Sequence, residues 1–234
     1  MPSAISQTFI QMPSGIDDDN LYCDSWRLSV ETNNAGYWKT AIPRCSSYVQ
    51  DYINGTKYLS DSMVVAMDSI DFAKTINITS DGNDAWVFDI DETLISNKAH
   101  FQRHGYESKR ANDFSFKEWV ESAQAPALPA SLELYNYLKI RGFTIFLLTG
   151  RPESQRNATV SNLLSAGYSG WCRLILRGKG EDDPAIVFKA GKRAELGKEG
   201  YKIHGNSGDQ WSDLLGYPAA ERSFKVPNPM YFVP

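Results

Sequence analysis

Apolar residues recur along the chain at two different spacings, and each spacing predicts a different kind of element. Helical spacing predicts two helices between residues 45 and 75, a short helix near 114–119, and helices over 131–139, 153–165 and 189–197. Short apolar runs predict strands at 85–88, 143–148, 173–176 and 201–204. The first run ends abruptly in acidic residues, which is typical of a strand buried on both faces of a parallel sheet. Residues 149–152 are predicted as a turn, and 205–213 as a loop that opens a last short helix.

The alternation of strands and helices from residue 85 onward predicts the fold class α/β, with a Rossmann-like, doubly wound parallel sheet. Residues 1–20 are polar, and we expect them to form an extended N-terminal arm. Residues 21–84 are expected to form a helical segment that packs on the core. The core itself is predicted to comprise residues 85–234.

The composition excludes several classes of protein. Of the 234 residues, 42% are hydrophobic, which suffices for a packed core and excludes wholesale disorder. The longest apolar runs, such as 145–148 and 63–67, are far too short to cross a bilayer. The formal net charge is -4, whereas a protein that binds nucleic acid usually carries a basic patch. We therefore expect neither a membrane nor a nucleic acid among the partners.

The cysteines leave two interpretations open. Cys23 and Cys45 enclose a short N-terminal segment, and they either form a disulfide in an oxidising compartment or remain free buried thiols. Neither these two nor Cys172 forms a Cys-x-x-Cys pair, so a structural zinc site is not expected. Glycosylation triplets of the form Asn-x-Ser/Thr occur at 54–56, 77–79 and 157–159. They favour the oxidising compartment and predict a glycoprotein.

The first residues, MPSAISQTFIQMPSG, contain neither the charged nor the apolar region of a signal peptide. Two explanations are open: the protein is cytosolic, or its signal peptide has been removed. We favour the second, and therefore expect a secreted or vacuolar protein.

Polar side chains follow the predicted strands at the points where they end. Asp89 and Asp91 follow the first strand, Thr149 follows the second, and Asp209 and Asp213 follow a later one. The carboxyl ends of the strands in a doubly wound sheet meet at one edge, where ligands bind. We therefore expect these side chains to gather in one crevice.

Two carboxylates close together repel each other unless they share a proton or a cation. Asp89 and Asp91 in the segment DIDET, joined by Asp209 and Asp213, are suited to a hard divalent ion, and Mg²⁺ prefers a few carboxylates, water and phosphate oxygens. A lone Asp-x-Asp is weak support, because acidic pairs are common on surfaces. A calcium-binding EF-hand loop that starts at Asp89 is excluded, because its required Gly and Glu positions hold Leu94 and His100.

Three motifs in a fixed order make the pattern specific. They are DIDET at 89–93, LTGR at 148–151 and GDQWSD at 208–213. This order resembles the haloacid dehalogenase (HAD) superfamily. The chain is more closely similar to the plant acid phosphatase and vegetative storage protein family, in HAD subfamily IIIB. The matching stretches, which span roughly residues 20–233, are 22–28, 31–36, 88–94, 146–151, 204–214 and 227–229.

The resemblance implies roles for the acidic residues. Asp89 would be the nucleophile that forms an aspartyl-phosphate, and Asp91 would protonate the leaving group and then activate water. Mg²⁺ would be held by Asp89, Asp209 and Asp213, and by Asp91 through its backbone carbonyl. An alternative role for Asp213 is to cap a helix.

The resemblance also implies the groups that bind the phosphoryl oxygens. Thr149 would donate its hydroxyl, and Gly150 its backbone amide. The balancing cation would be Lys189, although Lys192 lies three residues further on. Arg151 would either meet the phosphate or form a structural salt bridge.

In the superfamily, an insertion after the first motif forms a small cap over the site, which here corresponds to about residues 97–128. The cap residues that would contact the leaving group are aromatic or basic: His100, Phe101, Arg103, His104, Tyr106, Phe114 and Trp119. His100 and His104 form a weak candidate for a zinc pair.

The predicted function is that of a Mg²⁺-dependent acid phosphatase, an enzyme that hydrolyses small phosphomonoesters. The alternative is a storage or defence protein with weak residual phosphatase activity. Some storage members of the family have Ser at the nucleophile position, whereas this chain has Asp89, which favours the enzyme. Phosphotransfer to an acceptor alcohol would use the same intermediate. The resemblance also suggests a homodimer.

Overall fold

The computed structural model describes residues 18–103 and 114–234, and its centre is a parallel sheet of five strands. The strands lie in the order β3-β2-β1-β4-β5. Their bounds are Asp84–Phe88 for β1, Thr144–Pro152 for β2, Arg173–Arg177 for β3, Lys202–Gly208 for β4 and Arg222–Lys225 for β5. The chain runs outward from β1 to β3 and then returns to β4. The order therefore reverses beside β1, which confirms the predicted doubly wound sheet.

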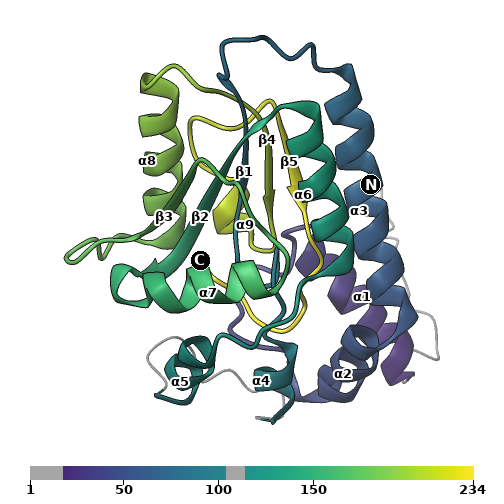
Figure 1. Cartoon of the computed structure of the whole chain (residues 1–234). Helices are drawn as coiled ribbons and strands as arrows, with labels where there is room; N and C mark the ends of the chain where they lie inside the picture. Colours follow the sequence, from purple (N-terminus) through teal and green to yellow (C-terminus); the bar gives the residue numbers. More distant parts are fainter. Residues whose placement is uncertain (1–17, 104–113) are drawn as a thin grey trace, which may run out of the picture.

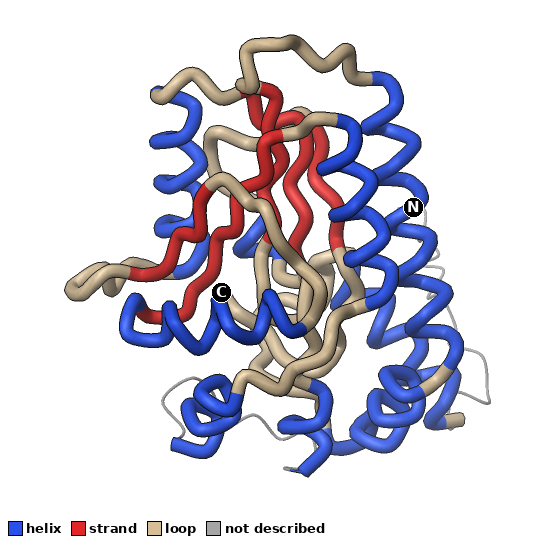
Figure 2. The backbone as a smooth tube through the Cα atoms, in the orientation of Figure 1, coloured by secondary structure: helices blue, strands red, loops and turns tan. Residues whose placement is uncertain are grey.

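Helices cover both faces of this sheet (Figures 1 and 2). One face is covered by α3 (Thr56–Thr75) and α6 (Pro129–Arg141), and the other by α8 (Ala185–Lys198). Successive side chains of a strand point to opposite faces. Accordingly, Trp86 and Phe88 of β1 pack in the core with α3 and α6, whereas its Ala85 and Val87 pack with α8.

The remaining helices lie mainly around the carboxyl ends of the strands (Figure 1). Their bounds are Asp19–Glu31 for α1, Ser46–Asn54 for α2, Lys98–Arg103 for α4, Phe114–Ser122 for α5, Arg156–Ser165 for α7 and Trp211–Leu214 for α9. Short 3-10 turns at Pro43–Cys45 and Glu153–Gln155 precede α2 and α7. No helix in the two described ranges has the length and apolar character of a membrane span.

Local chemistry explains several element ends. The carboxylate of Asp18 accepts hydrogen bonds from the amides of Asn20 and Leu21, so it caps α1. Helix α6 begins with Pro129 and ends at Gly142, whose φ of 95° is the left-handed conformation that glycine adopts readily. A disulfide joins Cys23 of α1 to Cys45, which settles the open question about this pair.

The structure corrects four sequence-based predictions of secondary structure. Residues 149–152, predicted as a turn, continue β2, because Pro152 still pairs with Arg177 of β3. Residues 205–208, predicted as loop, continue β4 between β1 and β5. Strand β5 was not predicted, since Phe224 is the single apolar residue in its sequence RSFK. The predicted arm is too long, because α1 takes its last two residues; residues 1–17 lie outside the described range. The division into arm, helical segment and core stays a prediction.

Candidate active site

The carboxyl ends of β1, β2 and β4 bring the predicted site residues to one edge of the sheet. Asp89 directly follows β1, and its amide donates to the carbonyl of Ser207 in β4 at 2.9 Å. Thr149 lies in the last part of β2, and Asp209 directly follows β4. All three side chains are buried. These three predicted residues thus lie at the same edge of the sheet.

Three carboxylates gather at this edge. Asp89, Asp209 and Asp213 each offer an oxygen, and these oxygens all lie within 4.8 Å of one another. The Nζ atom of Lys189, on α8, lies 2.5 Å from an oxygen of Asp89 and 2.5 Å from one of Asp213. Gly208 leaves room for the Asp213 side chain, because a Cβ atom at position 208 would collide with the Cβ of Asp213. We call these three aspartates the acidic cluster.

Burial and mutual repulsion shift the pKa values in the acidic cluster. Burial, together with the charge of Asp213, raises the pKa of Asp89 well above its ordinary value despite Lys189. Burial, Asp213 and Glu92 raise the pKa of Asp209 to about 7. When ionised, the three buried carboxylates carry more negative charge than the single ammonium of Lys189 balances. Every atom that these carboxylates offer to a metal ion is an oxygen. Such a set fits a hard divalent cation such as Mg²⁺.

Neighbouring side chains orient the aspartates that follow β4. Asn228 and Gln210 each donate a side-chain N–H to Oδ2 of Asp209 at 2.6 Å. One oxygen of Asp213 faces Lys189, and the other accepts the amide of Gln210 at 2.8 Å in a capping box at the start of α9. Asp213 therefore caps a helix and also belongs to the acidic cluster, and a metal role for its carboxylate stays a prediction.

Asp91 lies beside the acidic cluster with different partners. Arg151 holds its carboxylate with two bonds, from Nη2 to Oδ1 at 2.6 Å and from Nε to Oδ2 at 2.9 Å. Asn97 donates to Oδ1 at 2.7 Å. Burial by itself would raise the pKa of Asp91, but Arg151 and Asn97 outweigh it and lower the pKa below its ordinary value. The Asp91 side chain is thus an ion-pair partner, and a metal role for its carbonyl stays a prediction.

The structure distinguishes the three basic candidates. Lys189 contacts the acidic cluster, whereas Lys192 pairs with Glu181, before α8, and with Glu195 of the same helix. Arg151 forms the salt bridge with Asp91, and its Nη1 donates to the Thr159 hydroxyl at 3.0 Å.

A cavity of about 240 Å³ opens above these groups. Its lining includes the polar site residues Asp89, Asp91, Thr149 and Arg151 with Gly150, and the apolar or aromatic residues Phe101, Phe116, Tyr231 and Val233. A cavity with both polar and apolar lining residues suits an ester that carries a phosphate and a carbon skeleton.

The structure places the predicted cap residues in different surroundings. Phe101 lines the cavity, whereas Arg103 is exposed and His100 packs its ring against aromatic neighbours. The side chains of His104, Tyr106 and Phe114 lie outside the described part of the chain, so the zinc pair stays untested. Trp119 does not line the cavity, but its indole Nε1 donates to Asn97 at 2.8 Å.

Sequence reasoning missed several residues of the site. Tyr231 and Val233 reach the cavity from the C-terminal tail, where the sequence shows no motif beyond PNP at 227–229. Glu92 is buried, its pKa is raised to about 7 by burial and by Asp91, and it accepts a 2.5 Å hydrogen bond from the Tyr231 hydroxyl. The sequence signal that could have identified Glu92 as a site residue is its position inside the DIDET motif.

Comparison with known proteins agrees with this geometry. The family described as HAD superfamily, subfamily IIIB (Acid phosphatase) matches residues 7–234. Acid phosphatase 1 of Solanum lycopersicum is 44% identical over 225 residues, which are 96% of this chain and 88% of that protein. A stem 28 kDa glycoprotein of Glycine max is 40% identical, covering 90% of this chain and 84% of that protein. Vegetative storage protein 2 of Arabidopsis thaliana is 36% identical, with 91% and 80% covered.

A solved structure shares the fold at lower sequence identity. It is the class C acid phosphatase of Bacillus anthracis with tungstate bound, with a TM-score of 0.61 and 21% identity, over 80% of this chain and 85% of that one. The family match over nearly the whole chain and the 44% identical relative lead to one conclusion. The chain belongs to the acid phosphatases of HAD superfamily subfamily IIIB.

Proposed function

We propose that this acid phosphatase hydrolyses small phosphomonoesters through an aspartyl-phosphate on Asp89, with Mg²⁺ as the cofactor. The observation that carries the proposal is the placement of Asp89. It lines the cavity together with Asp91, belongs to the acidic cluster and lies 2.5 Å from the Lys189 ammonium.

In the first step, an oxygen of Asp89 attacks phosphorus, and the bond from phosphorus to the ester oxygen breaks. The departing alkoxide takes a proton from Asp91, which therefore has to be protonated when the substrate is bound, although Arg151 and Asn97 lower its pKa in the free enzyme. In the second step, a water molecule attacks the aspartyl-phosphate and gives its proton to Asp91, which releases Asp89 and inorganic phosphate. Each turnover therefore restores both carboxyl groups to their starting state.

The phosphoryl oxygens are expected to bind the Thr149 hydroxyl, the Gly150 amide and Lys189. Thr149 and Gly150 line the same cavity as Asp89. The Lys189 ammonium is buried, and a buried cation stabilises charge more strongly than one in water.

Asp89, Asp209 and Asp213 would hold the metal, with the Asp91 carbonyl as a further ligand. When bound, Mg²⁺ supplies positive charge that stabilises the phosphoryl group during transfer. The chain's own contribution is the fixed orientation of the ligands, since Asn228 and Gln210 hold Asp209, and Gln210 also holds Asp213.

We propose that the protein acts in an oxidising compartment, outside the cell or in the vacuole. The Cys23–Cys45 disulfide supports this location, because disulfides persist in oxidising compartments. Glycoprotein relatives in soybean support glycosylation of one or more of the three triplets.

The decisive test of the proposal is the variant Asp89→Asn. It removes the anionic oxygen, so hydrolysis of p-nitrophenyl phosphate with Mg²⁺ at pH 5 should disappear while the circular dichroism spectrum is unchanged. The control Asp71→Asn removes an exposed carboxylate on α3 that pairs with Lys74, and it should retain full turnover. Acid-quenched wild-type enzyme should carry covalent phosphate, and the Asp89→Asn variant should carry none. Retained turnover in that variant would refute the nucleophile assignment.

The vegetative storage relatives favour a second candidate function, a storage protein with weak activity. Wild-type turnover near zero in the same assay would support it. Product analysis with glycerol present distinguishes hydrolysis from phosphotransfer, because transfer yields glycerol phosphate in place of part of the inorganic phosphate.

A further inference from the structure

The side chain of Asn97 is fully buried between the proposed acid and the helix α5. It makes three side-chain hydrogen bonds: Nδ2 donates to Oδ1 of Asp91 at 2.7 Å and to Oε2 of Glu92 at 3.0 Å, and Oδ1 accepts from Nε1 of Trp119 at 2.8 Å. Its exposed fraction is 0%. Asn97 precedes α4, but its amide points toward these carboxylates.

Trp119 determines which way this amide faces. The indole N–H is a donor and never an acceptor, so the oxygen of the Asn97 amide must face it. The NH₂ group must then face the two carboxylates. A flipped amide would leave the indole N–H against another donor and the carboxylates against an oxygen.

The amide makes the two oxygens of Asp91 unequal. Oδ1 accepts from both Arg151 Nη2 and Asn97 Nδ2, whereas Oδ2 accepts from Arg151 Nε alone among the residues that the structure describes. A carboxylate oxygen has about two lone-pair sites. Both sites of Oδ1 are therefore occupied, and one site of Oδ2 is open.

We propose that Asn97, held by Trp119, is a positioning residue that occupies Oδ1 of Asp91 and reserves Oδ2 for the proton passed to the leaving group. The inference rests on the proposed function, in which Asp91 is the acid. Phe116, three residues before Trp119 and on the same side of α5, lines the cavity. The helix that meets the leaving group thus also orients the acid that protonates it.

The test is the variant Trp119→Phe, which keeps an aromatic ring and removes the indole N–H. The readout is kcat/KM for phosphomonoesters of falling leaving-group ability, because it reports the step that breaks the ester bond. General acid catalysis contributes about 10²–10⁴-fold and matters most for poor leaving groups. We expect a loss of less than about threefold for p-nitrophenyl phosphate and of about tenfold or more for ethyl phosphate.

The matched control is Trp171→Phe, the same exchange at a half-buried tryptophan just before β3, at the opposite edge of the sheet. It should leave the ratio of the two kcat/KM values unchanged. Thermal unfolding of both variants shows that they are folded. If Trp119→Phe lowers the unfolding temperature but leaves the ratio as in wild type, Trp119 only holds α5 in place and the inference is wrong.

The variant Asp91→Asn separates failure of the inference from failure of the proposed function. It should lower kcat/KM for ethyl phosphate far more than for p-nitrophenyl phosphate. If it lowers both equally, Asp91 is not the acid and that part of the proposed function fails. If Asp91→Asn shows the selective loss and Trp119→Phe does not, only the positioning role of Asn97 and Trp119 is refuted.

Discussion

At the scale of single residues, the site depends on the balance between the acidic cluster and one ammonium. Lys189 is buried and contacts both Asp89 and Asp213. These carboxylates raise its pKa despite the opposing effect of burial, so it stays charged across the working pH range. An uncharged side chain of similar length at this position could not balance the charge of the two carboxylates.

We therefore predict that Lys189→Met lowers kcat by about 10²–10³-fold, the usual cost of removing one group that stabilises transition-state charge. The control is Lys192→Met, one helical turn further along α8, whose ammonium pairs with Glu181 and Glu195 away from the cavity. Steady-state kinetics with p-nitrophenyl phosphate measures both. Equal losses in the two variants would argue against a specific role for Lys189.

A second residue-scale prediction concerns His204, at the opposite edge of the sheet. Its ring lies 2.7 Å from Asp84 and 2.9 Å from Glu221. Burial would lower the pKa of His204, but Glu221 and Asp84 outweigh it and raise the pKa above its ordinary 6.5. Asp84 is buried too, yet hydrogen bonds from Thr79 and the contact with His204 lower its pKa from 3.8 to about 2.

The sign of the pH effect follows from these directions. The contribution of His204 to the free energy of unfolding is complete below pH 6.5 and is lost as pH rises through the folded-state pKa of His204. The contribution of Asp84 to the same free energy is lost as pH falls from 3.8 toward 2. Urea unfolding should therefore show that His204→Gln destabilises the protein more at pH 5 than at pH 8. A larger loss at pH 8 would contradict a charged His204.

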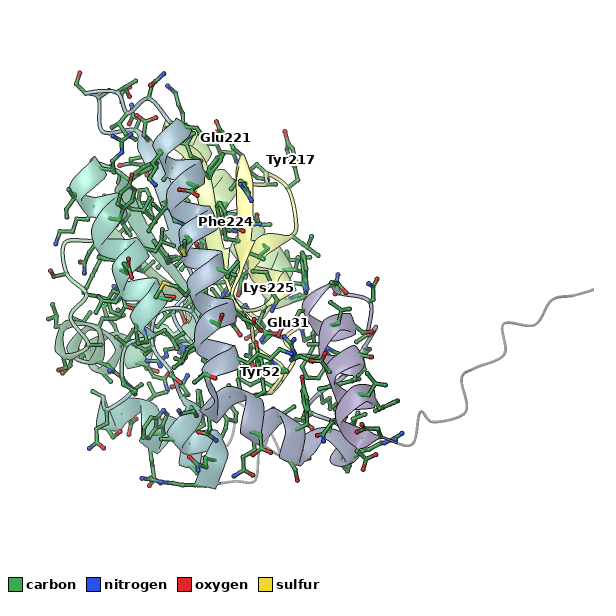
Figure 3. The ribbon with its side chains drawn as sticks, turned by 90° about the vertical axis from the view of Figure 1, so that its right-hand side faces the viewer. Glu31, Tyr52, Tyr217, Glu221, Phe224 and Lys225 are labelled. Atoms are coloured by element: carbon green, nitrogen blue, oxygen red, sulfur yellow. A yellow bond between two sulfur atoms is a disulfide. The ribbon has the colours of Figure 1, made fainter. Side chains whose placement is uncertain are left out.

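At the scale of elements, α1 and the C-terminal residues 226–234 support the acidic cluster from outside the sheet. Glu31, at the end of α1, accepts from Lys225 Nζ at 2.7 Å and from the Asn228 amide at 3.0 Å. Figure 3 shows Glu31 beside Lys225, where α1 meets the end of β5. The Asn228 side chain in turn donates to Asp209 at 2.6 Å. The two matching stretches at 31–36 and 227–229 thus meet at the site.

We predict that Asn228→Ala weakens Mg²⁺ binding by about 10–100-fold, because groups that orient a metal ligand typically contribute this much. The Mg²⁺ concentration for half-maximal activity and the rise in unfolding temperature with added Mg²⁺ both measure it. The control Asn34→Ala removes an exposed amide that bonds locally to Thr32, and it should change neither quantity. Unchanged Mg²⁺ dependence in Asn228→Ala would show that Asp209 needs no such support.

At the scale of the whole molecule, the Cys23–Cys45 disulfide ties α1 to the segment that precedes α2. It closes a loop with a sequence separation of 22 residues. The double variant Cys23→Ser, Cys45→Ser should lower the free energy of unfolding by about 3 kcal/mol, which is typical for a loop of this size. It should retain kcat, since the disulfide contacts no residue of the acidic cluster.

Urea unfolding measures the loss of unfolding free energy, with Cys172→Ser, at the exposed free cysteine, as the control. An unchanged free energy in the double variant would contradict a stabilising role.

The sequence by itself determined the parallel α/β core and the acidic end of its first strand. Buried strands such as β1 and β2 are continuous apolar runs, and motifs placed directly after strands must meet at one edge of a doubly wound sheet. Only the tertiary structure decided the continuation of β2 and β4, the formation of β5, the contact of Lys189 with the acidic cluster, and the partners of Asp91. The physical reason is that strand pairing, burial and ion pairs join residues far apart in the chain. Asn97 and Trp119, or Asn228 and Asp209, acquire their roles from contacts that no local pattern encodes.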